Sequence, residues 1–208
     1  MIRRAILFTD GTSDRPLAAH LEAMCIERGV RINVTAPEFE RLPEPPGLRI
    51  SDRLEFVLRG ERQPDLLFVH RDAEKDGAQA RLDEIEHAVQ QVAEGLPTVP
   101  VIPVRMTEAW LLADQQLIRQ VAGRPGSTDD LEIPELHRLE SIPDPKDVLQ
   151  RALAIASGTS GRHRKKFDRR FSSHRRLLVE RLDRTGPVSQ LPRWQALESD
   201  LEGVLSSM

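Results

Sequence analysis

Short apolar runs alternate with amphipathic stretches through the first two-thirds of the chain. The apolar runs lie at residues 5–8, 30–34, 66–70 and 99–104. Between them, apolar residues recur every three or four positions, as in residues 17–24 and 82–92. Such alternation is typical of strand-helix-strand units, in which helices cover a mainly parallel sheet. The sequence therefore predicts an α/β fold with a mainly parallel four-stranded sheet, whose strand at 99–104 lies nearest an edge because prolines interrupt it.

Turn residues indicate where the first elements end. Gly11 permits a tight turn after the first strand, and the next helix is expected to start near Ser13, with Pro16 in its first turn, and to stop at Gly29. Four prolines between residues 37 and 47 predict a loop, and a short helix is expected over residues 52–59. Thr107 predicts the N-cap of a helix that begins at Glu108.

The last third of the chain differs in kind. Its pattern predicts helices over residues 147–156, 163–182 and 194–205. Residues 162–184 contain ten Arg or Lys against three Asp or Glu, a local balance of +7, whereas the whole chain carries -3. This asymmetry predicts an α/β domain over residues 1–124 and a loop with a basic helical region, packed on that domain, over residues 125–208.

Composition excludes several classes of protein. A net charge of -3 argues against a protein that coats nucleic acid with its whole surface. No apolar run approaches the roughly 20 residues that a bilayer span needs, so we expect a cytoplasmic protein with no membrane contact. Cys25 is the only cysteine, which excludes an intrachain disulfide and a zinc site built from several cysteines.

Acidic residues follow three of the predicted strands. They are Asp10 after the first, Asp72 and Glu74 after the third, and Glu108 after the fourth. The carboxyl ends of parallel strands lie along one edge of a sheet, so these side chains are expected to gather there. Neighbouring carboxylates repel one another unless a cation offsets their charge, and oxygen ligands favour Mg²⁺ or Mn²⁺. The alternative is that each carboxylate caps a helix or lies solvated in a loop.

Three motifs carry a resemblance to a known family. They are Thr-Asp-Gly-Thr-Ser-Asp at residues 9–14, His-Arg-Asp-Ala-Glu at 70–74, and Arg-Met-Thr-Glu-Ala-Trp-Leu-Leu-Ala-Asp at 105–114. Together they make residues 4–120 similar to the DUF4276 family of TOPRIM-like bacterial proteins, and the third motif is the most specific. The resemblance implies a TOPRIM-like fold, in which a Glu after the first strand transfers protons and a pair of aspartates after the third holds Mg²⁺.

The chain departs from the TOPRIM pattern at two positions. Asp10 takes the place of the Glu and has a shorter reach, and Glu74 takes the place of the second aspartate and is longer by a methylene. The resemblance implies a Mg²⁺-dependent nuclease that hydrolyses phosphodiester bonds beside an ATPase partner in bacterial defence or DNA processing. Its metal would be held by Asp72, Glu74 and Glu108, with Asp10 as a further ligand or base. The departures keep open a second hypothesis, a catalytically silent TOPRIM-like interaction module of an ATPase-containing complex.

Basic residues provide candidate phosphate ligands. Arg71 and Arg105 flank the acidic residues, where they either bind substrate phosphate or hold the carboxylates in place as ion-pair partners. The basic helix adds Arg164, Lys165, Lys166 and Arg169. This helix is expected to bind the phosphate backbone of nucleic acid, with an acidic partner protein or a merely solvated face as the alternatives.

Other phosphate-handling classes do not fit the motifs. The chain has no Gly-x-Gly-x-x-Gly and no Gly-Lys-Ser/Thr, the loops that bind nucleotides in Rossmann and P-loop proteins. A haloacid-dehalogenase-type phosphatase would need its nucleophilic Asp where Phe8 stands. A response-regulator receiver needs a Lys that would fall between Lys75 and Lys146, where the chain has none.

Overall fold

The computed structural model describes residues 2–60 and 63–208. The chain forms two compact units. One contains the residues up to Ile102 together with Ala196–Met208, and the other contains Pro103–Gln195. The sequence placed the division after residue 124. The packing instead groups residues 103–124 with the helices that follow them, because α4 (Glu108–Leu111) and α5 (Gln115–Val121) pack on α6 (Pro145–Ser157) and α8 (Phe171–Glu180).

A parallel sheet forms the centre of the first unit. Its strands are β1 (Arg3–Phe8), β2 (Ile32–Thr35), β3 (Leu66–His70) and β4 (Thr98–Val101). All neighbours pair in parallel, in the order β2-β1-β3-β4. The predicted α/β class, the four parallel strands and the edge position of the proline-containing strand are therefore confirmed. The strand order reverses direction between β1 and β3, which is where ligands usually bind in such sheets.

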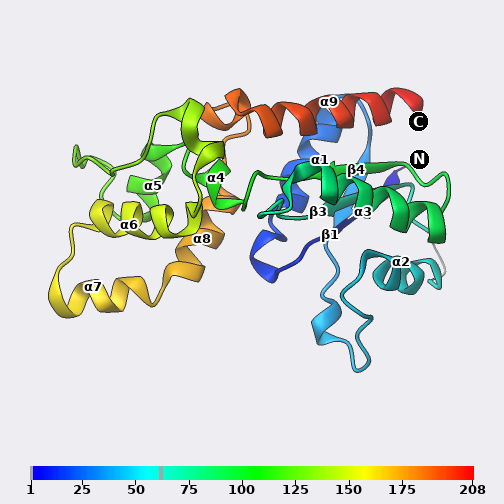
Figure 1. The fold of residues 1–208 in the computed structure, drawn as a ribbon, viewed down its shortest axis with the longest axis horizontal. Coiled ribbons are helices and arrows are strands. Elements are labelled where there is room, and N and C mark those ends of the chain that lie inside the picture. The colour runs from blue at the N-terminus through cyan, green and yellow to red at the C-terminus, as the bar shows by residue number, and fades with distance from the viewer. Residues whose placement is uncertain (1, 61–62) are drawn as a thin grey trace. The chain divides into compact units, whose positions relative to one another are not determined.

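Helices cover the sheet of the first unit on both faces. They are α1 (Leu17–Glu27), α2 (Ile50–Leu58) and α3 (Gly77–Val92), and Figure 1 shows α1 and α2 on opposite sides of the strands. One core cluster joins Ile6 and Leu67 from the strands to Leu54 of α2 and Ile85 of α3. The strand side chains between these point to the other face, since successive residues of a strand alternate.

The start of α1 differs from the prediction. Residues near Ser13 form a short 3₁₀ helix (Thr12–Asp14), and α1 begins only at Leu17, directly after Pro16 in the N-cap position. Helix α4 begins at Glu108 with Thr107 in the N-cap position, as predicted, although the Thr107 side chain makes no capping hydrogen bond. Asp114 caps the next helix instead, because its Oδ1 accepts a hydrogen bond of 2.9 Å from the backbone N–H of Leu117.

The second unit is helical and buries its own core. It contains α4, α5, α6, α7 (Gly161–Asp168) and α8, and the first residues of α9 (Pro192–Ser207). Trp110 and Trp194 form the centre of this unit, with ring centroids 5.0 Å apart in a T-shaped arrangement. Both indoles are fully buried.

The single helix expected over residues 163–182 is in fact two. The chain turns at Arg169 and Arg170, between α7 and α8. In one continuous helix, residues seven positions apart would be separated by about 10 Å along the axis. The turn instead stacks the Phe167 ring on the His174 ring, with centroids 4.2 Å apart. This aromatic contact, which no local pattern signals, accompanies the break.

Candidate functional site

The turns after β1 and β3 lie beside each other at the carboxyl edge of the sheet. Phe8 at the end of β1 is in register with Val69 of β3, so Asp10 and Asp72 follow neighbouring strands. Arg71 connects the two turns directly, because one of its terminal nitrogens donates to Oδ1 of Asp10. The first unit thus brings together the first two of the acidic turns singled out in the sequence.

Arg71 also offsets the negative charge of two carboxylates at the carboxyl edge of the sheet. Its other terminal nitrogen donates to Glu84 of α3, so a single guanidinium binds two carboxylates. Burial would lower the pKa of Arg71, but its hydrogen bonds to Glu84 and Asp10 outweigh that effect and raise it. Burial would raise the pKa of Glu84, but the hydrogen bonds from Arg71 and Arg81 outweigh this effect and lower the pKa. Arg71 therefore acts as an ion-pair partner, one of the two roles considered for it.

Arg81 of α3 holds the turn after β3 in the same way. Its Nη2 lies 3.6 Å from Oε2 of Glu74 and 3.2 Å from Oδ2 of Asp76. Its Nε donates to the backbone oxygen of Asp72 over 3.1 Å. Glu74 has a left-handed backbone, with φ 49°, a conformation that side chains rarely adopt. The Asp72 carboxylate lies 3.8 Å from Nε2 of the buried His70.

Glu108 belongs to the second unit and is buried there. Its Oε1 accepts a hydrogen bond of 2.7 Å from Nε of Arg175 on α8. The side chains are only 5% and 8% exposed, so this is an interior ion pair. Its charges compensate each other within the unit. Arg105, the other flanking arginine of the prediction, has a left-handed backbone with φ 64° in the loop before α4.

Most of these carboxylates form ion pairs with arginines in the structure. Asp10 and Glu74 of the first unit are paired with arginines, and so is Glu108 of the second. Among residues 2–60 and 63–208, no three His, Cys, Asp or Glu side chains are grouped so that they could hold a metal ion. A divalent cation at these carboxylates would compete with the arginines that pair with them.

A pocket of about 350 Å³ opens at the carboxyl ends of β1 and β2. Its wall is apolar at Leu7, Phe39 and Leu48, and Arg53 of α2 also lines the pocket. The Arg53 guanidinium lies 5.6 Å from the Phe39 ring centre and donates to the backbone oxygen of Thr9 over 2.7 Å. Burial lowers the pKa of Arg53. Sequence reasoning missed this arginine, because nothing in the local pattern of α2 indicates which loop its side chain reaches.

Four exposed cations on α7 and at its C-cap have no acidic partner among the described residues. Arg162, Lys165, Lys166 and Arg169 are all exposed and follow the spacing i, i+3, i+4, i+7, which places them along one face. Within the described part of the chain, no carboxylate pairs with any of these side chains. We call them the α7 cation stripe. Arg164, which the sequence grouped with them, lies off this face and pairs with Asp168 over 3.0 Å. Arg162, which the prediction did not include, lies on this face instead, as helical spacing would have indicated.

Comparison with known proteins gives no match, since no family model fits the sequence, no curated protein is similar to it and no solved structure matches the fold. The family resemblance of the three motifs therefore stays a prediction. Every helix in the described residues is too short or too polar to span a bilayer.

Proposed function

We propose that the protein is a catalytically silent TOPRIM-like module that binds the phosphate backbone of nucleic acid through the α7 cation stripe. The observation that carries the proposal is the stripe itself. Its cations share one exposed helix face and are not neutralised by any described carboxylate, although the chain as a whole is acidic. Exposed cations in a row are what a polyanion recognises, because each phosphate that they neutralise releases a counterion.

The ion pairs of the carboxylates after β1 and β3 support the proposal that the module is catalytically silent. Asp10 and Glu84 share Arg71, and Glu74 is within 3.6 Å of Arg81. These pairs leave the carboxylates with compensated charge and without the mutual repulsion that would draw in a cation. The departures from the TOPRIM pattern, Asp10 and Glu74, are the same side chains that the arginines hold.

Fluorescence anisotropy tests the binding with a labelled oligonucleotide as single strand and as duplex. The test variant replaces Arg162, Lys165, Lys166 and Arg169 with Ala. The matched control replaces Arg31, Lys75, Arg138 and Lys146, which are also exposed and also two Arg and two Lys. We expect the stripe variant to lose affinity for both forms of the oligonucleotide, and the control to retain it. Equal losses in the two variants would mean that net charge alone attracts the ligand.

A Mg²⁺-dependent nuclease is the second candidate. One observation favours it, namely that the acidic turns of Asp10 and Asp72 follow adjacent strands of the sheet. It predicts cleavage of DNA or RNA with Mg²⁺ or Mn²⁺ that disappears in Asp72→Ala, while circular dichroism shows an unchanged fold. The silent module predicts intact nucleic acid with either metal. An ATPase partner, implied by the resemblance in both cases, is tested by reconstitution with a candidate ATPase.

A further inference from the structure

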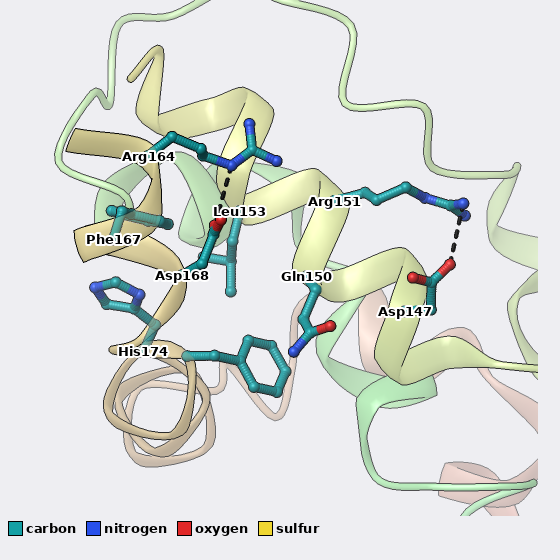
Figure 2. A pocket seen from close by; sticks show the side chains of 9 residues that line it. Asp147, Gln150, Arg151, Leu153, Arg164, Phe167, Asp168 and His174 are labelled. Atoms are coloured by element: carbon teal, nitrogen blue, oxygen red, sulfur yellow. Dashed lines mark hydrogen bonds and ion pairs between the residues drawn. The ribbon is translucent and has the colours of Figure 1, made fainter. Parts of the chain in front are cut away.

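A second pocket, of about 240 Å³, lies among three helices of the second unit. Asp147, Gln150 and Arg151 line it from α6, and Arg164, Phe167 and Asp168 from α7. Phe171 and His174 of α8 complete the wall. Figure 2 shows Gln150 pointing from α6 into the space that faces α7 and α8. The volume is below that of most drug-sized ligand sites, which suits one small ring system.

The wall of this pocket is aromatic on the α7 and α8 side. Phe167 and His174 stack with ring centroids 4.2 Å apart and an angle of 28° between their planes. Leu153, which also lines the pocket, is buried, whereas Phe171 is partly exposed. Burial, with a further contribution from Arg170, lowers the pKa of His174, which favours the uncharged ring. Aromatic faces of this kind stack on planar groups.

The charged residues around the pocket cancel in pairs. Arg151 lies 3.0 Å from Asp147 across one turn of α6, and Arg164 lies 3.0 Å from Asp168 across one turn of α7 (Figure 2). Gln150 is exposed and its amide, which offers both a donor and an acceptor, makes no hydrogen bond to any described residue. The lining therefore suits an uncharged planar group that has hydrogen-bonding atoms on its edge.

Two arginines lie in the chain between the pocket-lining residues Asp168 and Phe171. Arg169 ends the α7 cation stripe, and Arg170 follows it in the turn that leads into Phe171. Both are exposed, and no described carboxylate pairs with them. Arg170 is near enough to His174 to influence its protonation. An aromatic pocket with a neutral lining thus adjoins cations that can bind a phosphate.

We propose that this pocket receives one unpaired nucleobase, which stacks on Phe171 and hydrogen bonds to Gln150 while its phosphate binds Arg169 or Arg170. The inference deepens the proposed function and rests on it, because the strand is delivered by the α7 cation stripe. It adds a preference for single strands, since a paired base cannot enter a pocket without leaving its duplex.

The test compares a single-stranded oligonucleotide, the same strand with abasic residues, and the duplex. Stacking on an aromatic side chain is worth roughly 1–3 kcal/mol per base, so Phe171→Ala should weaken binding of the intact single strand roughly 5- to 150-fold. Binding of the abasic strand and of the duplex should not change. Phe56→Ala, the same change at the exposed Phe56 of α2, is the control. Gln150→Ala, at an exposed position, should reproduce the selective loss without disturbing the packing.

Equal affinity of the intact and abasic strands would overturn the inference, as would a Phe171→Ala variant that binds every ligand like the Phe56→Ala control. Failure of the proposed function looks different, because the stripe variant would then bind all three ligands as tightly as the wild type. In that event saturation-transfer NMR with a free nucleoside tests the pocket directly. A signal lost in Phe171→Ala and Gln150→Ala supports the pocket, and no signal in the wild type refutes it.

Discussion

Replacing Glu108 with Leu separates a structural role for this residue from a catalytic one. In the structure its carboxylate is paired with Arg175 at 2.7 Å, and the two side chains are 5% and 8% exposed. The substitution leaves the Arg175 guanidinium in the interior without this carboxylate. An exposed pair on the same helix, Arg176 with Glu180 at 2.8 Å, provides the control, because Glu180 is 37% exposed.

The expected loss of stability follows from burial. Breaking a buried ion pair by removing one partner costs about 3–5 kcal/mol, since it leaves an uncompensated charge in the interior. An exposed pair contributes only about 0–1 kcal/mol, because water screens it and the side chains lose conformational freedom. We therefore expect Glu108→Leu to lower the free energy of unfolding by at least about 2 kcal/mol more than Glu180→Leu does.

Urea denaturation followed by circular dichroism, without metal and with excess Mg²⁺, measures this difference. The double variant Glu108→Leu, Arg175→Leu replaces the whole ion pair with apolar side chains. It should recover most of the lost free energy of unfolding, because well-packed apolar residues can replace a buried pair. The reasoning is refuted if Glu108→Leu is no worse than Glu180→Leu. It is also refuted if Mg²⁺ stabilises the wild type but not the Glu108→Leu variant, since ligand-dependent stabilisation would mean that the carboxylate binds metal.

Three further outcomes follow from single side chains. Burial raises the pKa of the Cys25 thiol to about 11, so a thiol reagent at neutral pH should label the native protein far more slowly than the urea-unfolded one. The pKa of Glu84 is lowered, so its contribution to stability is present above the ordinary carboxyl range and lost as the pH falls through the lowered value. Glu84→Gln should therefore lose less stability than the wild type between neutral pH and pH about 3. Burial raises the pKa of Glu140, which costs stability as the pH rises past the ordinary carboxyl range, so Glu140→Gln should flatten that decline in urea titrations.

The sheet could be predicted from the sequence because its signals are local. Residues 66–70 form a continuous apolar run, which a strand buried on both faces requires, and β3 has these bounds. Prolines at positions 100 and 103 indicated the edge strand for a similarly local reason, the missing backbone donor. The parallel topology then follows, because helices of suitable length separate the strands.

The partners of the acidic residues could not be predicted. Glu108 and Arg175 are 67 positions apart, and no periodicity connects them. Asp10 and Arg71 are 61 positions apart and meet only because β1 and β3 are neighbours. The sequence indicates which carboxylates follow strands. It does not indicate which arginine lies beside each carboxylate in the fold, and this decides whether the carboxylate is free for a cation or forms an ion pair.

The break between α7 and α8 was missed for a related reason. Phe167, Phe171 and Leu178 keep a helical phase across the turn, so the pattern predicts one helix. The stack of Phe167 on His174 requires the chain to turn. Helical spacing within α7 would have separated the exposed cations from Arg164 and its partner Asp168, a distinction that the prediction did not make.

The salt dependence of nucleic-acid binding tests the central claim most directly. For duplex DNA, the logarithm of the affinity falls against the logarithm of the salt concentration with a slope of roughly -0.9 per phosphate contact. If the α7 cation stripe makes one contact per side chain, the variant without Arg162, Lys165, Lys166 and Arg169 should have a slope shallower than that of the wild type by roughly 3–4. The account predicts this change in the stripe variant and none in the variant of Arg31, Lys75, Arg138 and Lys146. Identical slopes for the wild type and the stripe variant would contradict it.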